Sequence, residues 1–222
     1  LAFSETFVLA GYSDWRLPTI KELYSLIIFS GRDINPQSSS ANTPFIDTEN
    51  FGFGYGDTDA GERIIDAQFA TSTLDVGDSQ FGGGNLMFGV NFADGRIKGY
   101  PTGAMPGRNS GKKFYVLFVR GNEKYGQNNF AENDDGTITD KATGLMWLQD
   151  DSGEGMNWQE ALEFSESTTY AGYSDWRLPD AKELQSIVDY TRAPGATNSA
   201  AIDPVFNCTQ ITNEAGQPDF PF

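Results

Sequence analysis

Two copies of an Asp-Trp-Arg tripeptide carry side chains that could bind a sugar. A tryptophan ring stacks on the face of a sugar, and an arginine guanidinium binds a carboxylate or sulfate through paired hydrogen bonds. The alternative is structural and is the commoner one: each Trp fills the core just before a helix, and each Arg pairs with the nearby Asp. The candidate ligand-binding residues of the two tripeptides are Trp15, Arg16, Trp176 and Arg177.

Two acidic segments could hold Ca²⁺, which takes six to eight oxygen ligands. The first lies in and beside the glycine-rich loop 52–61, where Tyr55 is a further candidate ligand contact. The second surrounds Gly136. Their alternatives are a solvated acidic loop and an Asp-Gly turn between short strands. The candidate metal ligands are Asp57, Asp59, Glu62, Asn133, Asp135 and Asp140, and we expect no cofactor other than this Ca²⁺.

Side chains suited to catalysis are scarce. The chain has no histidine and a single cysteine, Cys208. Serine and threonine hydroxyls therefore lack the usual activating base, and paired-cysteine chemistry is excluded. A polysaccharide hydrolase with two carboxylates is an alternative, although no pair of acidic residues stands out. We expect a protein that is not an enzyme.

The net charge and the hydropathy of the chain limit the classes of partner that it can bind. The 222 residues carry a net charge of −16, which repels nucleic-acid phosphates and anionic membranes. No apolar run approaches the ~18 residues of a membrane span. We therefore expect no nucleic-acid partner and no membrane insertion. Apolar residues make up 38% of the chain, enough for a packed core.

The tripeptides belong to a longer internal repeat. Residues 10–18 read AGYSDWRLP and recur as residues 171–179, 161 positions later. Over residues 3–25, 16 of 23 positions are identical to those of 164–186. Little else matches between the two halves, so we interpret residues 1–125 as a first copy that lacks its N-terminal part. Residues 126–222 are a second copy that lacks its C-terminal part, with a polar boundary at 121–129.

Capping signals predict the helices that position the repeat. Thr19 with Glu22, and Asp180 with Glu183, form capping boxes directly after AGYSDWRLP. Asn157 with Glu160 starts a third helix. The residues expected to face inward are Ile20, Leu23, Leu26, Ile27, Trp158, Ala161, Leu162, Ala181, Leu184, Ile187 and Val188.

Strands are predicted between and beyond these helices. Residues 86–92 form a strand that turns at Asp94-Gly95, and residues 114–119 form a buried strand. Residues 137–139 and 145–148 form a short pair. Helices followed by antiparallel strands and long loops indicate an α+β fold.

In this order the motifs resemble the C-terminal domain family of the Legionella collagen-like protein. Its core is carried by residues 135–140, 142–147, 157–158, 171–179 and 182–184, and its closing half by residues 69–73, 90–95 and 114–121. The resemblance implies a C-type-lectin-like fold, distantly like that of formylglycine-generating enzymes, in tandem copies on a bacterial surface or secreted protein. The closing strand of the family often carries a cysteine that residues 116–120 lack. Cys208 then pairs with such a cysteine outside this segment, or it is a buried free thiol.

The resemblance implies an extracellular or cell-surface adhesin that recognises a glycan or another cell-surface polymer, with Ca²⁺ assisting. One alternative is a structural subunit of an extracellular filament or tandem array, built by self-association through head-to-tail domain completion. The polysaccharide hydrolase is the other.

Overall fold

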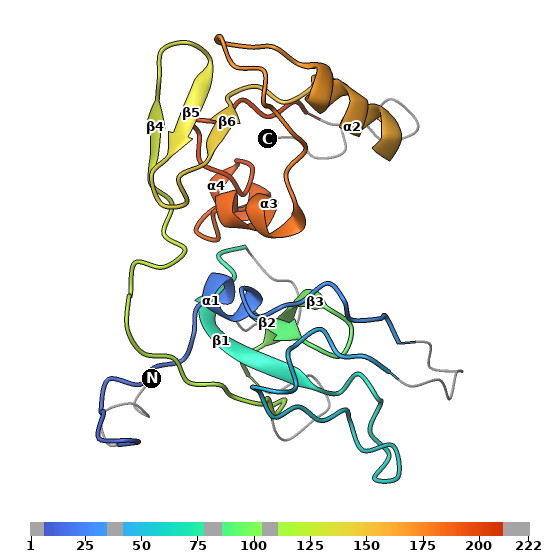
Figure 1. The fold of residues 1–222 in the computed structure, drawn as a ribbon. Helices are drawn as coiled ribbons and strands as arrows, with labels where there is room; N and C mark the ends of the chain where they lie inside the picture. The colour runs from blue at the N-terminus through green and yellow to red at the C-terminus, as the bar shows by residue number, and fades with distance from the viewer. Residues whose placement is uncertain (1–6, 35–41, 78–85, 104–110, 211–222) are drawn as a thin grey trace. The chain divides into compact units, whose positions relative to one another are not determined.

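The structure is a computed structural model that describes residues 7–34, 42–77, 86–103 and 111–210 (Figure 1). The chain divides into two compact units, unit 1 at Leu1–Tyr125 and unit 2 at Gly126–Phe222. Each unit has its own small antiparallel sheet, with one short helix in the described part of unit 1 and three in that of unit 2. The chain is therefore a mixed α and β protein with few helices, as the sequence predicts at that level.

The sheet of unit 1 has three antiparallel strands in the order β1–β2–β3. They are β1 (Gln68–Leu74), β2 (Leu86–Asn91) and β3 (Arg96–Pro101). The predicted Asp-Gly hairpin is confirmed: Gly95 has a φ of +70°, which favours glycine, and its amide donates to Asn91 O at 2.8 Å. Val90 and Phe92 are fully buried, so this hairpin carries the core of unit 1.

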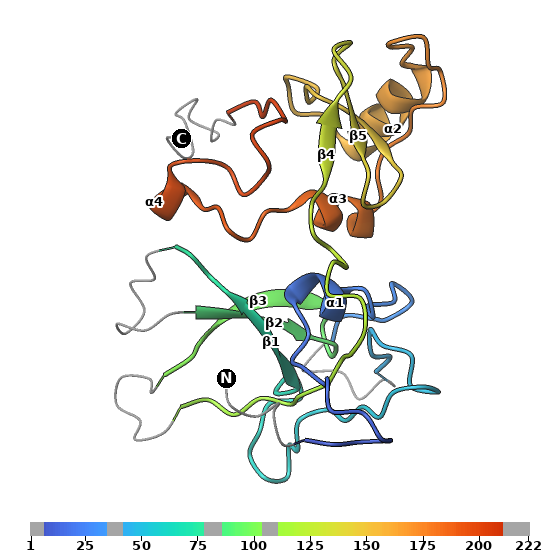
Figure 2. The same ribbon diagram turned by 90° about the vertical axis from the view of Figure 1, so that its left-hand side faces the viewer.

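The helix α1 (Ile20–Tyr24) packs on this sheet, as both views show (Figures 1 and 2). The predicted capping box is present, because Thr19 accepts from the amide of Glu22 and Glu22 accepts from the amide of Thr19. Ile20 and Leu23 bury the apolar side of the helix, and Ile27, just beyond its end, is fully buried. Burying such side chains stabilises a fold by about 1.5–3 kcal/mol each.

The segment 114–119 is not the buried strand that its sequence predicts. Tyr115 pairs with β1 through a parallel bridge to Phe69, and Val119 forms an antiparallel bridge with Arg16. Tyr115, Val116 and Phe118 are each more than two-fifths exposed. The prediction is wrong because the segment crosses from one partner to another and forms single bridges, not a continuous ladder.

Unit 2 begins with a second antiparallel sheet, in the order β4–β5–β6. Its strands are β4 (Phe130–Glu132), β5 (Thr137–Asp140) and β6 (Met146–Leu148). The predicted pairing of 137–139 with 145–148 is confirmed, whereas β4 was not predicted. The core of this sheet is Ile138, which is fully buried.

Three helices follow: α2 (Trp158–Ser167), α3 (Ala181–Ile187) and α4 (Pro194–Thr197). The capping boxes predicted at Asn157 and Asp180 are both present. The predicted inward faces are confirmed only in part: Ile187 is buried and Ala161, Leu162 and Val188 are half-buried, whereas Trp158, Ala181 and Leu184 are exposed. No residue of α2 is buried, Trp158 is 73% exposed, and on α3 only Ile187 is buried. These faces have no covering element in the described part of unit 2.

The length and polarity of the helices determine whether any of them could span a lipid bilayer. In the part of the chain that the structure describes, every helix is too short or too polar to cross a membrane.

Candidate functional site

The repeated nonapeptide forms a tight turn with the same backbone in both units. In unit 1, Leu9 and Tyr12 exchange two backbone hydrogen bonds of 3.0 Å across Ala10 (φ +52°) and Gly11 (φ +80°). Glycine adopts a φ of +80° much more readily than other residues, so the turn favours glycine at position 11. We call this the turn motif of unit 1.

In unit 2, Tyr170 and Tyr173 exchange the same two bonds, at 3.0 and 2.9 Å. Ala171 (φ +51°) and Gly172 (φ +82°) lie at the tip. This is the turn motif of unit 2. The two identical sequences therefore have the same local conformation.

Each candidate tryptophan closes its own turn. The indole nitrogen of Trp15 donates to Leu9 O at 3.1 Å, and that of Trp176 donates to Tyr170 O at 3.4 Å. Both rings are half-buried. The tryptophans thus hold the turn motifs in shape, and their contact with a ligand stays a prediction.

Each candidate arginine is held by a glutamate of the following helix. Arg16 donates to the two oxygens of Glu22 at 2.7 and 2.5 Å, and Arg177 donates to those of Glu183 at the same distances. The expected pairing of Arg16 with Asp14 is wrong. The capping glutamate takes the guanidinium because its carboxylate already faces the start of the helix.

The carboxylates of these pairs have lowered pKa values. Burial raises the pKa of Glu22, but hydrogen bonds from Arg16 and from the Thr19 amide together lower it by more. The pKa of Glu22 is therefore below its ordinary value. The hydrogen bond from Arg177 is the main cause that lowers the pKa of Glu183 to about 2. Both pairs are therefore ionised at neutral pH.

Beside the turn motif of unit 1, an arginine lies on an exposed tyrosine. The guanidinium of Arg120 is 3.6 Å from the centre of the Tyr12 ring, and its Nε donates to Asp14 at 2.8 Å. Tyr12 is 47% exposed. The hydrogen bond from Arg120 is the main cause that lowers the pKa of Asp14. We call Tyr12, Asp14 and Arg120 the Tyr12 platform.

The corresponding residues of unit 2 are also at the surface. Tyr173 is 44% exposed and meets Trp176 edge to face, with ring centres 6.2 Å apart. Asp175 is exposed too. Both units thus present an exposed tyrosine and an exposed aspartate beside a half-buried tryptophan on one turn.

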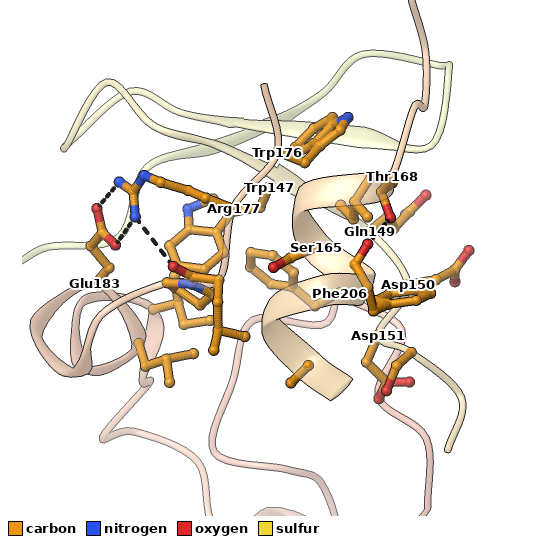
Figure 3. A pocket seen from close by; sticks show the side chains of 18 of the residues that line it. Trp147, Gln149, Asp150, Asp151, Ser165, Thr168, Trp176, Arg177, Glu183 and Phe206 are labelled. Atoms are coloured by element: carbon orange, nitrogen blue, oxygen red, sulfur yellow. Dashed lines mark hydrogen bonds and ion pairs between the residues drawn. The ribbon is translucent and has the colours of Figure 1, made fainter. Parts of the chain in front are cut away.

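Unit 2 also has a pocket of about 780 Å³, shown in Figure 3. Trp147 lies between the Arg177–Glu183 pair and Ser165 of α2. The ring of Trp147 meets Phe206 edge to face at 6.5 Å. The indole nitrogen of Trp147 is buried and has no hydrogen-bond partner among the described residues.

The residues predicted to bind Ca²⁺ are engaged in local turns. Asp57 accepts from the amides of Asp59 and Ala60, and Glu62 accepts from the amide of Asp57. Over the described residues, no three Asp, Glu or Cys side chains gather closely enough to hold a metal ion.

The second predicted Ca²⁺ group shows the same pattern. Asn133 bonds Thr137 and Thr139, Asp135 accepts from Thr137, and Asp140 accepts from the amide of Ala142. These bonds build the Asp-Gly turn that was the alternative. Ca²⁺ binding stays a prediction from the sequence.

Two remaining candidates lie apart from the turn motifs. Tyr55 packs edge to face on Phe53 at 5.1 Å, and its hydroxyl is buried without a hydrogen-bond partner among the described residues. Burial raises the pKa of that hydroxyl. Cys208 is exposed, so the alternative of a buried thiol is wrong.

The sequence reasoning missed two residues of the Tyr12 platform. Tyr12 had a signal, because it recurs as Tyr173 within the repeat. Arg120 had none, since it is 106 residues from Asp14 and only the fold brings them together.

The chain thus consists of two small mixed α and β units, and each unit has the same hydrogen-bonded turn motif. These features define a class of modular domain. The chain matches the Lcl C-terminal domain family over residues 1–120 and 136–219, which is nearly its full length. It therefore belongs to that family, which is associated with collagen-like surface proteins. No curated protein and no solved structure matches the chain.

Proposed function

We propose that this chain is an extracellular adhesion module that binds carbohydrate on its turn motifs, in a C-type-lectin-like scaffold present as tandem copies. The observation that carries the proposal is the Tyr12 platform, where Arg120 lies 3.6 Å over an exposed tyrosine ring. Family membership supports the extracellular setting.

The chemistry of the platform suits an acidic or sulfated sugar. Arg120 uses its Nε for Asp14, which leaves the two terminal nitrogens without another partner among the described residues. These nitrogens form a planar fork that matches a carboxylate or sulfate. The exposed ring of Tyr12 and the half-buried ring of Trp15 offer aromatic contact to the sugar ring.

Unit 2 repeats the aromatic part of this surface, but none of its described residues is a counterpart of Arg120. Tyr173, Asp175 and Trp176 occupy the positions of Tyr12, Asp14 and Trp15. Two such turns on one chain raise the avidity for a polymer, because the second contact becomes intramolecular. The net charge of −16 opposes a polyanion, so binding must depend on this local site and not on the overall field.

A glycan array probed with the purified chain tests the proposal, followed by titration of the best glycan and of heparin. We expect Tyr12→Ala and Arg120→Lys each to weaken binding by about fivefold, since an aromatic contact is worth about 1 kcal/mol and lysine lacks the planar fork. Tyr125→Ala is the matched control, because Tyr125 is 49% exposed but lies outside both turn motifs.

The absence of any glycan ligand, or full binding by Tyr12→Ala, would contradict the proposal. Parallel titrations with EDTA test the separate Ca²⁺ prediction, which requires binding to fall on chelation. Release of reducing ends from the bound polysaccharide would show a hydrolase instead of a binder.

A further inference from the structure

In unit 1 a β-sheet covers the segment that follows the turn motif. Arg16 and Val119 exchange backbone hydrogen bonds of 2.9 Å, the amide of Ser72 in β1 donates to Pro18 O at 2.8 Å, and the amide of Ile20 donates to Thr73 Oγ1 at 3.0 Å. We call residues 15–27 the turn–helix segment of unit 1. Its backbone groups are paired by β1 and by the segment around Val119.

The same cover buries the apolar side chains of that segment. Leu17 packs against a cluster of Ala70, Met87 and Tyr100 on the sheet. Leu23 is 1% exposed and Ile27 is fully buried. The sheet therefore supplies both hydrogen bonds and apolar contacts to the turn–helix segment.

Residues 176–188 are the turn–helix segment of unit 2, and the likeness extends beyond the helix. The amide of Ile28 donates to Phe45 O, and the amide of Asp189 donates to Ala201 O, both at 2.9 Å. The two segments therefore share the capping box and the backbone hydrogen bond after the helix, although α1 has five residues and α3 has seven.

Yet the turn–helix segment of unit 2 is open. Leu184, which stands where unit 1 has Leu23, is 49% exposed. The side chain of Arg177 is 57% exposed, against 25% for Arg16, although both make the same ion pair. Across the described residues of unit 2, no strand lies opposite Arg177 as Val119 lies opposite Arg16.

The open surface is the pocket shown in Figure 3, and a residue of its wall has a buried donor without a partner among the described residues. Leu178, Leu184 and Ile187 line it together with Trp147. The buried indole nitrogen of Trp147 has no acceptor in the described residues, and a buried donor without a partner costs free energy.

We propose that this pocket binds a β-sheet from a further polypeptide segment of the same family. The residue pattern of that segment is the one seen in residues 67–119. The occupant is defined by what covers the matched residues of unit 1: strands that pair with the backbone at positions 16, 18 and 20 and present apolar side chains to Leu23. The β1–β2–β3 sheet of this chain already covers α1, so the partner is another sheet of that kind. The proposal is independent of glycan binding.

Thiol labelling of the full chain tests it. In a Cys208→Ser background, Leu184→Cys and Leu23→Cys report on matched positions. We expect Leu184→Cys to react with a maleimide at least about tenfold faster than Leu23→Cys, which reacts only after local opening. When residues 67–125 are appended after Phe222, we expect labelling of Leu184→Cys to slow by at least about tenfold.

The matched control is the same extended chain with Val90→Asp in the appended copy only, because Val90 is fully buried in β2. The control should leave Leu184→Cys reactive. Unchanged labelling in the extended chain would overturn the proposal, and so would protection by the control. Protection of Leu184→Cys in the unextended chain that rises with protein concentration would overturn it too, because the occupant would then be a second copy of this chain. The comparison at Leu184 is decisive even if Leu23→Cys does not fold.

Discussion

The Arg16–Glu22 and Arg177–Glu183 pairs connect each turn motif to the helix after it. Each glutamate serves twice: it accepts the guanidinium and also the amide of the N-cap residue, at 2.8 Å in both units. One carboxylate therefore fixes the end of the turn and the start of the helix. This dual role explains why arginine and glutamate stand six residues apart in both copies.

The Glu183 pair makes the stability of unit 2 depend on pH. The hydrogen bond from Arg177 lowers the pKa of Glu183 from its ordinary value of 4.5 to about 2 in the folded chain. A carboxylate with a lowered folded pKa stabilises the fold above the unfolded pKa, and this contribution is lost as the pH falls from about 4.5 towards 2. We expect Glu183→Gln to lower the free energy of unfolding by roughly 1 kcal/mol at pH 7 and to have little effect near pH 2.

Urea denaturation at pH 7, 5, 3 and 2, followed by tryptophan fluorescence, measures this difference. Three of the four tryptophans lie in unit 2, so the signal reports mainly on that unit. Glu166→Gln on the exposed side of α2 is the control and should match the wild-type chain. An equal effect of Glu183→Gln at every pH would show that the ion pair does not contribute as described.

The capping boxes at Thr19, Asn157 and Asp180 could be predicted at the scale of the element, because their contacts span three residues. The inward faces of α2 and α3 could not, since hydrophobic spacing shows which side is apolar but not whether anything covers it. The same holds for residues 114–119, whose apolar run found separate partners in Phe69 and Arg16.

Leucine substitutions on the two matched helices measure the difference in cover. We expect Leu23→Ala to cost about 2–5 kcal/mol of stability, since it removes a fully buried side chain and leaves a cavity. Leu184→Ala should cost under about 1 kcal/mol, because half of that side chain already faces solvent. Urea denaturation of both variants gives the two values, and similar costs would contradict the difference in burial.

At the scale of the whole molecule, the repeat organises the chain. The boundary between the units falls at Tyr125 and Gly126, within the polar segment 121–129. Each unit has the turn motif and its helix, whereas the three-stranded sheets before and after them differ. The sequence carried the information for the repeated parts. The Tyr12 platform, by contrast, depends on the return of the chain at Arg120 and could not be predicted from local patterns.

Hydrogen exchange of the unmodified full chain tests most directly the central claim, that the two turn–helix segments share one fold but differ in cover. We expect the Tyr12 and Tyr173 amides to be protected alike, since both are bonded within their own turns at 3.0 and 2.9 Å. The Arg16 amide, bonded to Val119 O, should exchange at least about a hundredfold more slowly than the Arg177 amide. Equal exchange at Arg16 and Arg177 would contradict the account.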